Sequence, residues 1–265
     1  MPAGLFILRH WKKQVQVFQQ NLALVKKQKQ TEAVHDLRVA VKKMRSYLKL
    51  LNIARQDNYS LAFDGTEKLF SVMGKYRDIE MGLYLLGHFE KENNTCYKVF
   101  NDYLAIALLQ QSKWLQLAVL EYDENELTGL TYQLEQDLKD ADREELMHQF
   151  KVVIEKEFKK ALRHVNHFNR DTHQIRKIFK DIFYWVEIAP VNMLMEAGQV
   201  KKIKKILNNL GDWQDHEMLH QKIKHFRKDF VPDARDEYQT LKDLESNILG
   251  QKEKLLDKAK AIAIF

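Results

Sequence analysis

Cysteine is almost absent from this sequence. Cys96 is the only cysteine among 265 residues, so no intrachain disulfide can form and a reducing compartment is natural. It stands in a helix-like run, where we expect a buried or half-buried side chain. Three prolines and nine glycines are also few for this length. Strands and hairpins are normally punctuated by those two residues, so their scarcity favours long helices.

Long hydrophobic runs are missing too. No segment approaches the 18 or more apolar residues of a membrane span. The short apolar stretch 3–8 is followed by cations rather than preceded by them, which is the reverse of a secretory signal. We therefore expect a soluble, cytoplasmic protein without a membrane partner. The net charge of +6 and the pI near 9.1 are only a weak indication of a polyanionic partner.

Helical periodicity is present along nearly the whole chain and predicts an all-α fold. Asp142 with Glu145 fits a capping box, and Thr31 is a second candidate N-cap. Pro190 and Pro232 stand where helices should end, because proline lacks an amide donor. The predicted helices are 5–29, 32–51, 57–91, 95–120, 126–140, 143–167, 172–188, 194–228 and 234–260.

Two sequence blocks recur 137 to 138 residues further along the chain. The first is His35-Asp36-Leu37-Arg38, echoed by His173-Gln174-Ile175-Arg176. The second is the segment 74–81, echoed by 211–218, each opening with Gly and carrying Asp at its fifth position. We therefore expect two pseudo-repeated antiparallel bundles of about four helices each, the halves being residues 1–125 and 126–265 of a single domain 1–265.

The first block carries a basic stripe. Its members recur at intervals of three and four residues, which keeps them on one helix face with a cation roughly every 5 Å. They are His35, Arg38, Lys42, Arg45 and Lys49. Both arginines are predicted to face solvent. The opposite face is predicted to be core and consists of Leu37, Val41, Met44, Leu48 and Leu51. An idle surface would intersperse acids, and Arg suits forked contacts to phosphate, so the pattern favours a polyanionic ligand.

The second block repeats this design in weaker form. His173, Arg176 and Lys180 share one face, and Ile175, Phe179, Ile182 and Val186 form the other. The stripe then ends, because Phe183 and Glu187 stand at the positions of Arg45 and Lys49. The lysine-rich segment 201–205 compensates in part. The two stripes could line opposite walls of one basic central groove.

These motifs resemble the CHAD family, the conserved histidine α-helical domain. The resemblance lies in the segment 35–45, in 173–184, and in the elements Gly74 to Asp78 and Gly211 to Asp215. It covers essentially the whole chain. The chain resembles a stand-alone member, because no triphosphate-tunnel (CYTH) domain accompanies it. Phe183 departs from the arginine usual in the family, which weakens the second stripe and raises the question of lowered affinity.

The resemblance implies two helical bundles around a basic channel that binds inorganic polyphosphate, with association to polyphosphate granules. Other polyanions are further candidate ligands, and no cofactor or metal is implied. Carried onto this chain, the polyphosphate-binding residues would be His35, Arg38, Lys42, Lys43, Arg45, Lys49, Arg77, His173, Arg176, Lys177, Lys180, Lys201, Lys202 and Lys205. No arrangement of residues supports hydrolysis or synthesis, so we expect a binding protein rather than an enzyme.

Three alternatives stay open. Phosphate-facing cations do not by themselves distinguish nucleic acid from polyphosphate, although single-strand binders need stacking aromatics beside the cations. A helical scaffold that docks acidic protein segments is a second alternative. The third is a zinc-dependent hydrolase, because His216-Glu217-Met218-Leu219-His220 matches the H-E-x-x-H signature. The first half lacks both histidines at the equivalent positions, so this match is not part of the repeated design.

Overall fold

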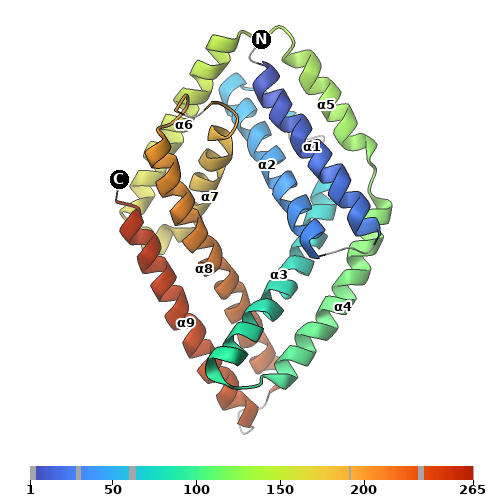
Figure 1. Ribbon diagram of the computed structural model, residues 1–265, viewed down its shortest axis with the longest axis vertical. Coiled ribbons are helices and arrows are strands. Elements are labelled where there is room, and N and C mark those ends of the chain that lie inside the picture. Colours follow the sequence, from blue (N-terminus) through green and yellow to red (C-terminus); the bar gives the residue numbers. More distant parts are fainter. Residues whose placement is uncertain (1–3, 28–30, 60–63, 191, 232–235, 265) are drawn as a thin grey trace. The chain divides into compact units, whose positions relative to one another are not determined.

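The computed structural model describes residues 4–27, 31–59, 64–190, 192–231 and 236–264. These residues form nine α-helices and no strand (Figure 1), which confirms the predicted all-α class. The helices are α1 Gly4–Lys26, α2 Thr31–Arg55, α3 Asp64–Asn93, α4 Lys98–Glu121, α5 Asn125–Asp137, α6 Arg143–Val165, α7 Phe168–Val186, α8 Ala197–Phe230 and α9 Asp236–Ile262. Among the described residues, no helix is long and apolar enough to span a membrane.

Most helix ends lie within a few residues of the predicted ones. Asp142 is an N-cap, because its side chain accepts a hydrogen bond from the backbone N–H of Glu145 at 2.9 Å. The third helix differs most, since it begins at residue 64 instead of 57. Gln56 has a positive φ of 61°, which ends α2 before that point. Pro232 lies outside the described residues.

The prediction for Cys96 was wrong, because its side chain is exposed. The predicted helix 95–120 begins only at Lys98. Asn94 adopts a positive φ of 47°, and residues 95–97 form a non-helical connection between α3 and α4. Cys96 therefore lies in a surface connection rather than on a helix face.

The chain divides into two compact units, each of which combines residues from both predicted halves. Unit 1 comprises residues up to 73 together with 116–204. Unit 2 comprises residues 74–115 with 205–264. The compact units therefore do not coincide with the predicted halves 1–125 and 126–265, and the internal repeat stays a prediction.

Unit 1 is organised around α2, which packs against α1, α6 and α7, while α1 also packs against α5. Its largest fully buried side chains include Trp11, Phe18, Tyr47, Phe150 and Trp185. The two buried tryptophans keep hydrogen bonds for their indole N–H groups, as buried polar groups require. Trp11 donates to Oγ1 of Thr131 at 2.8 Å, and Trp185 donates to the carbonyl of Ser46 at 2.7 Å.

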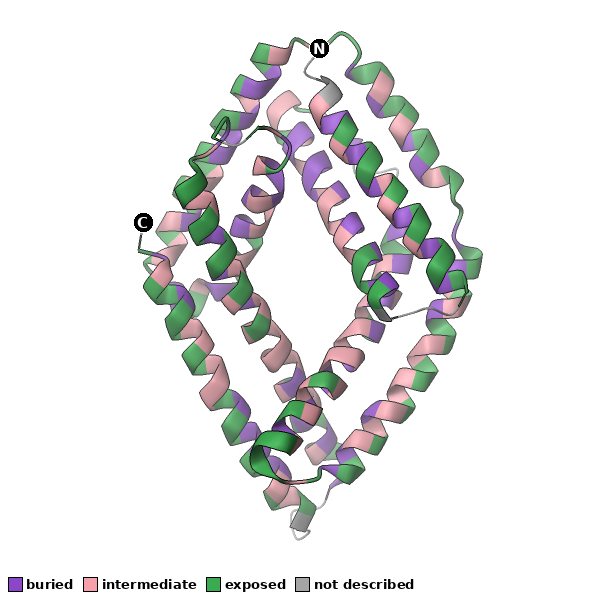
Figure 2. Cartoon of the chain, viewed as in Figure 1, coloured by how far each residue is buried: buried purple, intermediate pink, exposed green. Residues whose placement is uncertain are grey.

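Unit 2 has a core of its own, formed by parts of α3, α4 and α8 together with α9. Leu86, Phe100, Leu219 and Leu244 are at most 1% exposed. The ring of Phe226 lies 5.2 Å from that of Phe100, within an aromatic cluster. Figure 2 shows buried and exposed residues alternating around most helices, as expected for amphipathic helices with one face on a core.

Candidate functional site

The predicted basic stripe of the first block lies on α2, as a partly buried face of unit 1. The five residues predicted as the core face of this helix, Leu37, Val41, Met44, Leu48 and Leu51, are all at most 4% exposed. His35 on the stripe is exposed, whereas Arg38, Lys42, Arg45 and Lys49 are half-buried. The prediction that both arginines simply face solvent was therefore wrong, because neighbouring elements partly cover them.

One of those neighbours is Phe70, in the first turns of α3. The guanidinium carbons of Arg45 and Arg38 lie 4.0 and 4.6 Å from the centre of its ring, and Nζ of Lys42 lies 6.0 Å away. Nη1 of Arg38 also donates to the Phe70 carbonyl at 3.0 Å. Cation–π contacts with the Phe70 ring keep these three cations close together, although their like charges repel one another. Glu67, one turn earlier, forms an ion pair with Arg45.

The stripe of the second block lies on α7, and three of its predicted core residues, Ile175, Phe179 and Ile182, are 0% exposed. The fourth, Val186, is only half-buried because it ends the helix. Arg176 and Lys180 are half-buried, whereas His173 and Lys177 are exposed. Tyr184 lies beside one cation of each block, although Lys43 is not a member of the α2 stripe. The Nζ atoms of Lys43 from α2 and Lys180 from α7 lie 5.6 and 5.9 Å from the centre of its ring. Cations of both blocks therefore gather at one place in unit 1.

The sequence analysis did not predict that acids of the second block form ion pairs with these cations. Asp181 of α7 binds Lys49 and also accepts a hydrogen bond from Ser46 at 3.2 Å. Glu187, just after α7, binds Lys43 at 2.7 Å. The signal was available in the repeat, since Asp181 and Glu187 stand at the positions of Lys43 and Lys49. Acids at those positions let the two helices attract instead of repel.

We call the seven half-buried cations of α2 and α7 the basic face. They are Arg38, Lys42, Lys43, Arg45, Lys49, Arg176 and Lys180. Carboxylates that contact them include those of Glu67, Asp181 and Glu187. The charge of the basic face is thus partly neutralised by these acids.

The other predicted site residues are not part of the basic face as defined. Lys201 and Lys202 are exposed at the start of α8 in unit 1, and Lys201 lines a pocket together with Phe183 and Glu187. Arg77 and Lys205 belong to unit 2. Arg77 forms an ion pair with Glu80 one turn along α3.

The H-E-x-x-H residues lie on α8 in unit 2, and their contacts are structural. Glu217 binds Lys252 of α9 and accepts a hydrogen bond from Gln221 at 2.6 Å. Burial alone would raise the pKa of the Glu217 carboxyl, but the Lys252 and Gln221 hydrogen bonds lower it. Nδ1 of His216 lies 2.8 Å from the carbonyl of Asp212. No group of three metal-ligating side chains occurs within the described ranges.

These observations first define a class. The described residues form an all-α protein of long packed helices, with an internally paired basic face on two of them. The particular family follows from comparison with known proteins. The family model of the CHAD domain matches residues 9–224, and the chain belongs to that family.

The structure agrees with this assignment. The crystal structure of the CHAD domain from the plant Ricinus communis is similar, with a TM-score of 0.74. The match covers 99% of this chain and 92% of that chain at 16% sequence identity, which shows the fold alone. No curated protein matches the chain.

Proposed function

We propose that this protein binds inorganic polyphosphate through the basic face without catalysing a reaction. One observation carries the proposal. Lys43 and Lys180, which stand 137 residues apart in the two CHAD-like blocks, both lie beside the ring of Tyr184 on the neighbouring helices α2 and α7. An extended, flexible polyanion is the ligand that such a row of cations suits.

The chemistry of the side chains fits phosphate. The fixed forks of Arg38 and Arg45 match the oxygens of a phosphate group, and the lysines act as point charges beside them. Nε of Arg45 is buried and has no hydrogen-bond acceptor within the described residues. The ion pairs with Glu67, Asp181 and Glu187 are partly exposed, so each is weak and screened by salt. A multivalent anion can replace several of them together.

The aromatic rings of the basic face favour polyphosphate over single-stranded nucleic acid. Base stacking needs an accessible π face. The guanidinium groups of Arg38 and Arg45 already occupy the Phe70 ring, and Tyr184 is only 8% exposed. These rings hold cations instead of bases. Nucleic-acid binding is the competing reading that the binding experiment must exclude.

The test is a titration with long-chain polyphosphate at two salt concentrations, with single-stranded RNA of matched charge as competitor. We expect tight binding that weakens steeply with salt, because phosphate contacts release counterions. RNA should displace the polyphosphate poorly. Equal displacement by RNA would make the basic face a general polyanion surface, and no binding would refute the proposal.

The non-catalytic part of the proposal has its own test. Long-chain polyphosphate incubated with the protein and Mg²⁺ or Mn²⁺ should keep its chain length on a gel. If the wild type shortened the chains and a basic-face variant shortened them equally, a contaminant would be responsible. If the wild type shortened them and the variant did not, the protein would be an enzyme. Localisation at polyphosphate granules in the cytoplasm is the cellular expectation that follows from the binding.

A further inference from the structure

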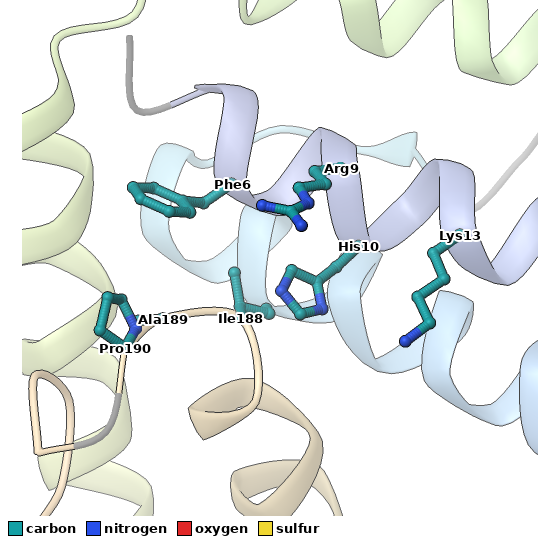
Figure 3. A pocket seen from close by; sticks show the side chains of 7 residues that line it. All are labelled: Phe6, Arg9, His10, Lys13, Ile188, Ala189 and Pro190. Carbon is teal, nitrogen blue, oxygen red and sulfur yellow. The ribbon is translucent and has the colours of Figure 1, made fainter. Parts of the chain in front are cut away.

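A second cationic site lies in unit 1, beside α1. A pocket of about 250 Å³ opens between α1 and the segment after α7 (Figure 3). Phe6, Arg9, His10 and Lys13 line it from α1, and Ile188, Ala189 and Pro190 line it from that segment. Figure 3 shows the three basic side chains on the same side of the helix, with Ile188 next to the His10 ring. None of these residues belongs to the basic face.

The cations of this pocket differ from those of the basic face in their surroundings. Among the described residues that line the pocket there is no carboxylate. Within the described residues, neither Arg9 nor Lys13 has an ion-pair partner. Other cations nearby do have one, since Lys12 on the same helix binds Glu135 and Lys43 binds Glu187. Arg9 and Lys13 are exposed cations one helical turn apart beside an apolar wall, an arrangement that can receive an anion, and the nearby Glu187 does not line the pocket.

His10 adds a half-buried polar group between the two cations. Burial lowers its pKa below the usual 6.5, and the charges of Lys13, Arg9 and Lys43 act in the same direction against the opposing effect of Glu187. Its ring meets Tyr47 edge-on at 6.5 Å. A neutral imidazole can donate one hydrogen bond to a phosphate oxygen at neutral pH without adding to the repulsion between Arg9 and Lys13.

We propose that this pocket binds a terminal phosphate group, separately from the basic face, and thereby holds the end of a polyphosphate chain. A terminal phosphate exposes three charged oxygens and approaches a charge of −2 at neutral pH, whereas an internal phosphate exposes two and carries −1. Arg9, His10 and Lys13 offer donors for all three oxygens. The small volume suits one or two phosphate groups better than a larger ligand. The assignment of the bound phosphate to the end of a polyphosphate chain rests on the proposed function, whereas the phosphate site itself does not.

Pyrophosphate is the probe, because both of its groups are terminal. Isothermal titration should show binding to the wild type that Arg9→Gln/Lys13→Gln weakens by about tenfold for each cation removed. The matched control is Lys12→Gln/Lys26→Gln, which removes the same charge from the same helix at residues bound to Glu135 and Glu124. The control should bind like the wild type. Absence of pyrophosphate binding, or equal loss in both variants, would overturn the proposal.

A second arm separates this pocket from the basic face. The pocket variant should lose affinity for tripolyphosphate far more than for long chains, which have few ends for each phosphate. Orthophosphate as competitor tests whether free phosphate is the ligand, and displacement at equal concentration would overturn the chain-end assignment. A wild type that binds pyrophosphate through the pocket but not long chains would refute the proposed function alone. Long-chain binding with a variant that keeps full affinity for tripolyphosphate would refute the pocket alone.

Discussion

Lys43 donates a hydrogen bond from Nζ to Oε2 of Glu187, 2.7 Å away. Glu187 lies 138 residues after Lys49, and Lys49 in turn binds Asp181, which lies 138 residues after Lys43. Each of these two lysines of α2 thus binds the acid that stands at the position equivalent to the other lysine. A two-fold relation between repeated segments produces this kind of reciprocal contact. The internal repeat stays a prediction, and these pairs support it.

The first prediction concerns that pair. Lys43→Glu should lower the melting temperature, because it places two carboxylates together beside Tyr184. The exchange Lys43→Glu/Glu187→Lys should restore much of the loss. The coupling measured in a double-mutant cycle should stay near 1 kcal/mol or below, as for other partly exposed pairs. Thermal unfolding of all four proteins measures it. An exchange variant no more stable than Lys43→Glu would show that the pair does not hold α2 to α7.

The two arginines on Phe70 give the second prediction. Arg38→Lys/Arg45→Lys keeps the charge but loses the fork, so polyphosphate affinity should fall. Arg38→Gln/Arg45→Gln should bind more weakly still, by about tenfold for each lost charged contact, and with a shallower salt dependence. Binding titrations at several salt concentrations measure both.

Lys12→Gln/Lys26→Gln is again the control of equal charge, and circular dichroism checks helicity. If the glutamine variant kept wild-type affinity while folded, the basic face would not be the polyphosphate site. If the control lost as much affinity as the glutamine variant, only the net charge of the protein would matter.

Trp185 of α7 is a buried residue that is hydrogen-bonded to α2, the helix that carries most of the basic face. It is 0% exposed, and its indole N–H donates to the Ser46 carbonyl on α2. Trp185→Phe should cost about 1–3 kcal/mol, because the buried carbonyl loses a partner and the smaller ring leaves space. Urea unfolding measures the loss. Trp114→Phe, at a residue 63% exposed on α4, should be nearly neutral. Equal effects of the two substitutions would contradict this account.

Much of this architecture could be predicted from the sequence. The core face of α2 needs only the apolar period of three and four residues, and Leu37 and Met44 are buried as predicted. The roles of Phe70 and Tyr184 could not be predicted, because aromatic residues at helical spacing are usually core. The pocket at Arg9 could not be predicted either. It depends on where the segment 188–190 packs against α1, and no local sequence signal determines such a long-range contact.

The zinc-hydrolase alternative makes an opposite prediction to ours. Glu217 is held by Lys252, so we expect Glu217→Gln to lower stability by about 1–3 kcal/mol through loss of a charged hydrogen bond. The purified protein should carry no stoichiometric zinc by elemental analysis. One zinc per chain that disappears in His216→Ala/His220→Ala would support the metalloenzyme and refute our assignment.

The last prediction is a pH dependence at the junction of α6 and α7. Hydrogen bonds from Arg170 and from His164, whose Nδ1 lies 2.8 Å away, hold the pKa of the Asp171 carboxyl well below its usual value. A lowered folded pKa contributes stability that is fully present above the unfolded pKa of about 3.9 and is lost as pH falls through the folded value. The melting temperature of Asp171→Asn should therefore lie below that of the wild type near neutral pH.

This gap should narrow as the pH falls below about 4, because the protonated carboxyl of Asp171 and the amide that replaces it in the variant are then both uncharged. Thermal melts across the acid range measure it. Asp140→Asn, in the exposed turn after α5, provides the control and should show no such narrowing. A gap that stayed constant with pH would mean that Asp171 acts through packing rather than through its charge.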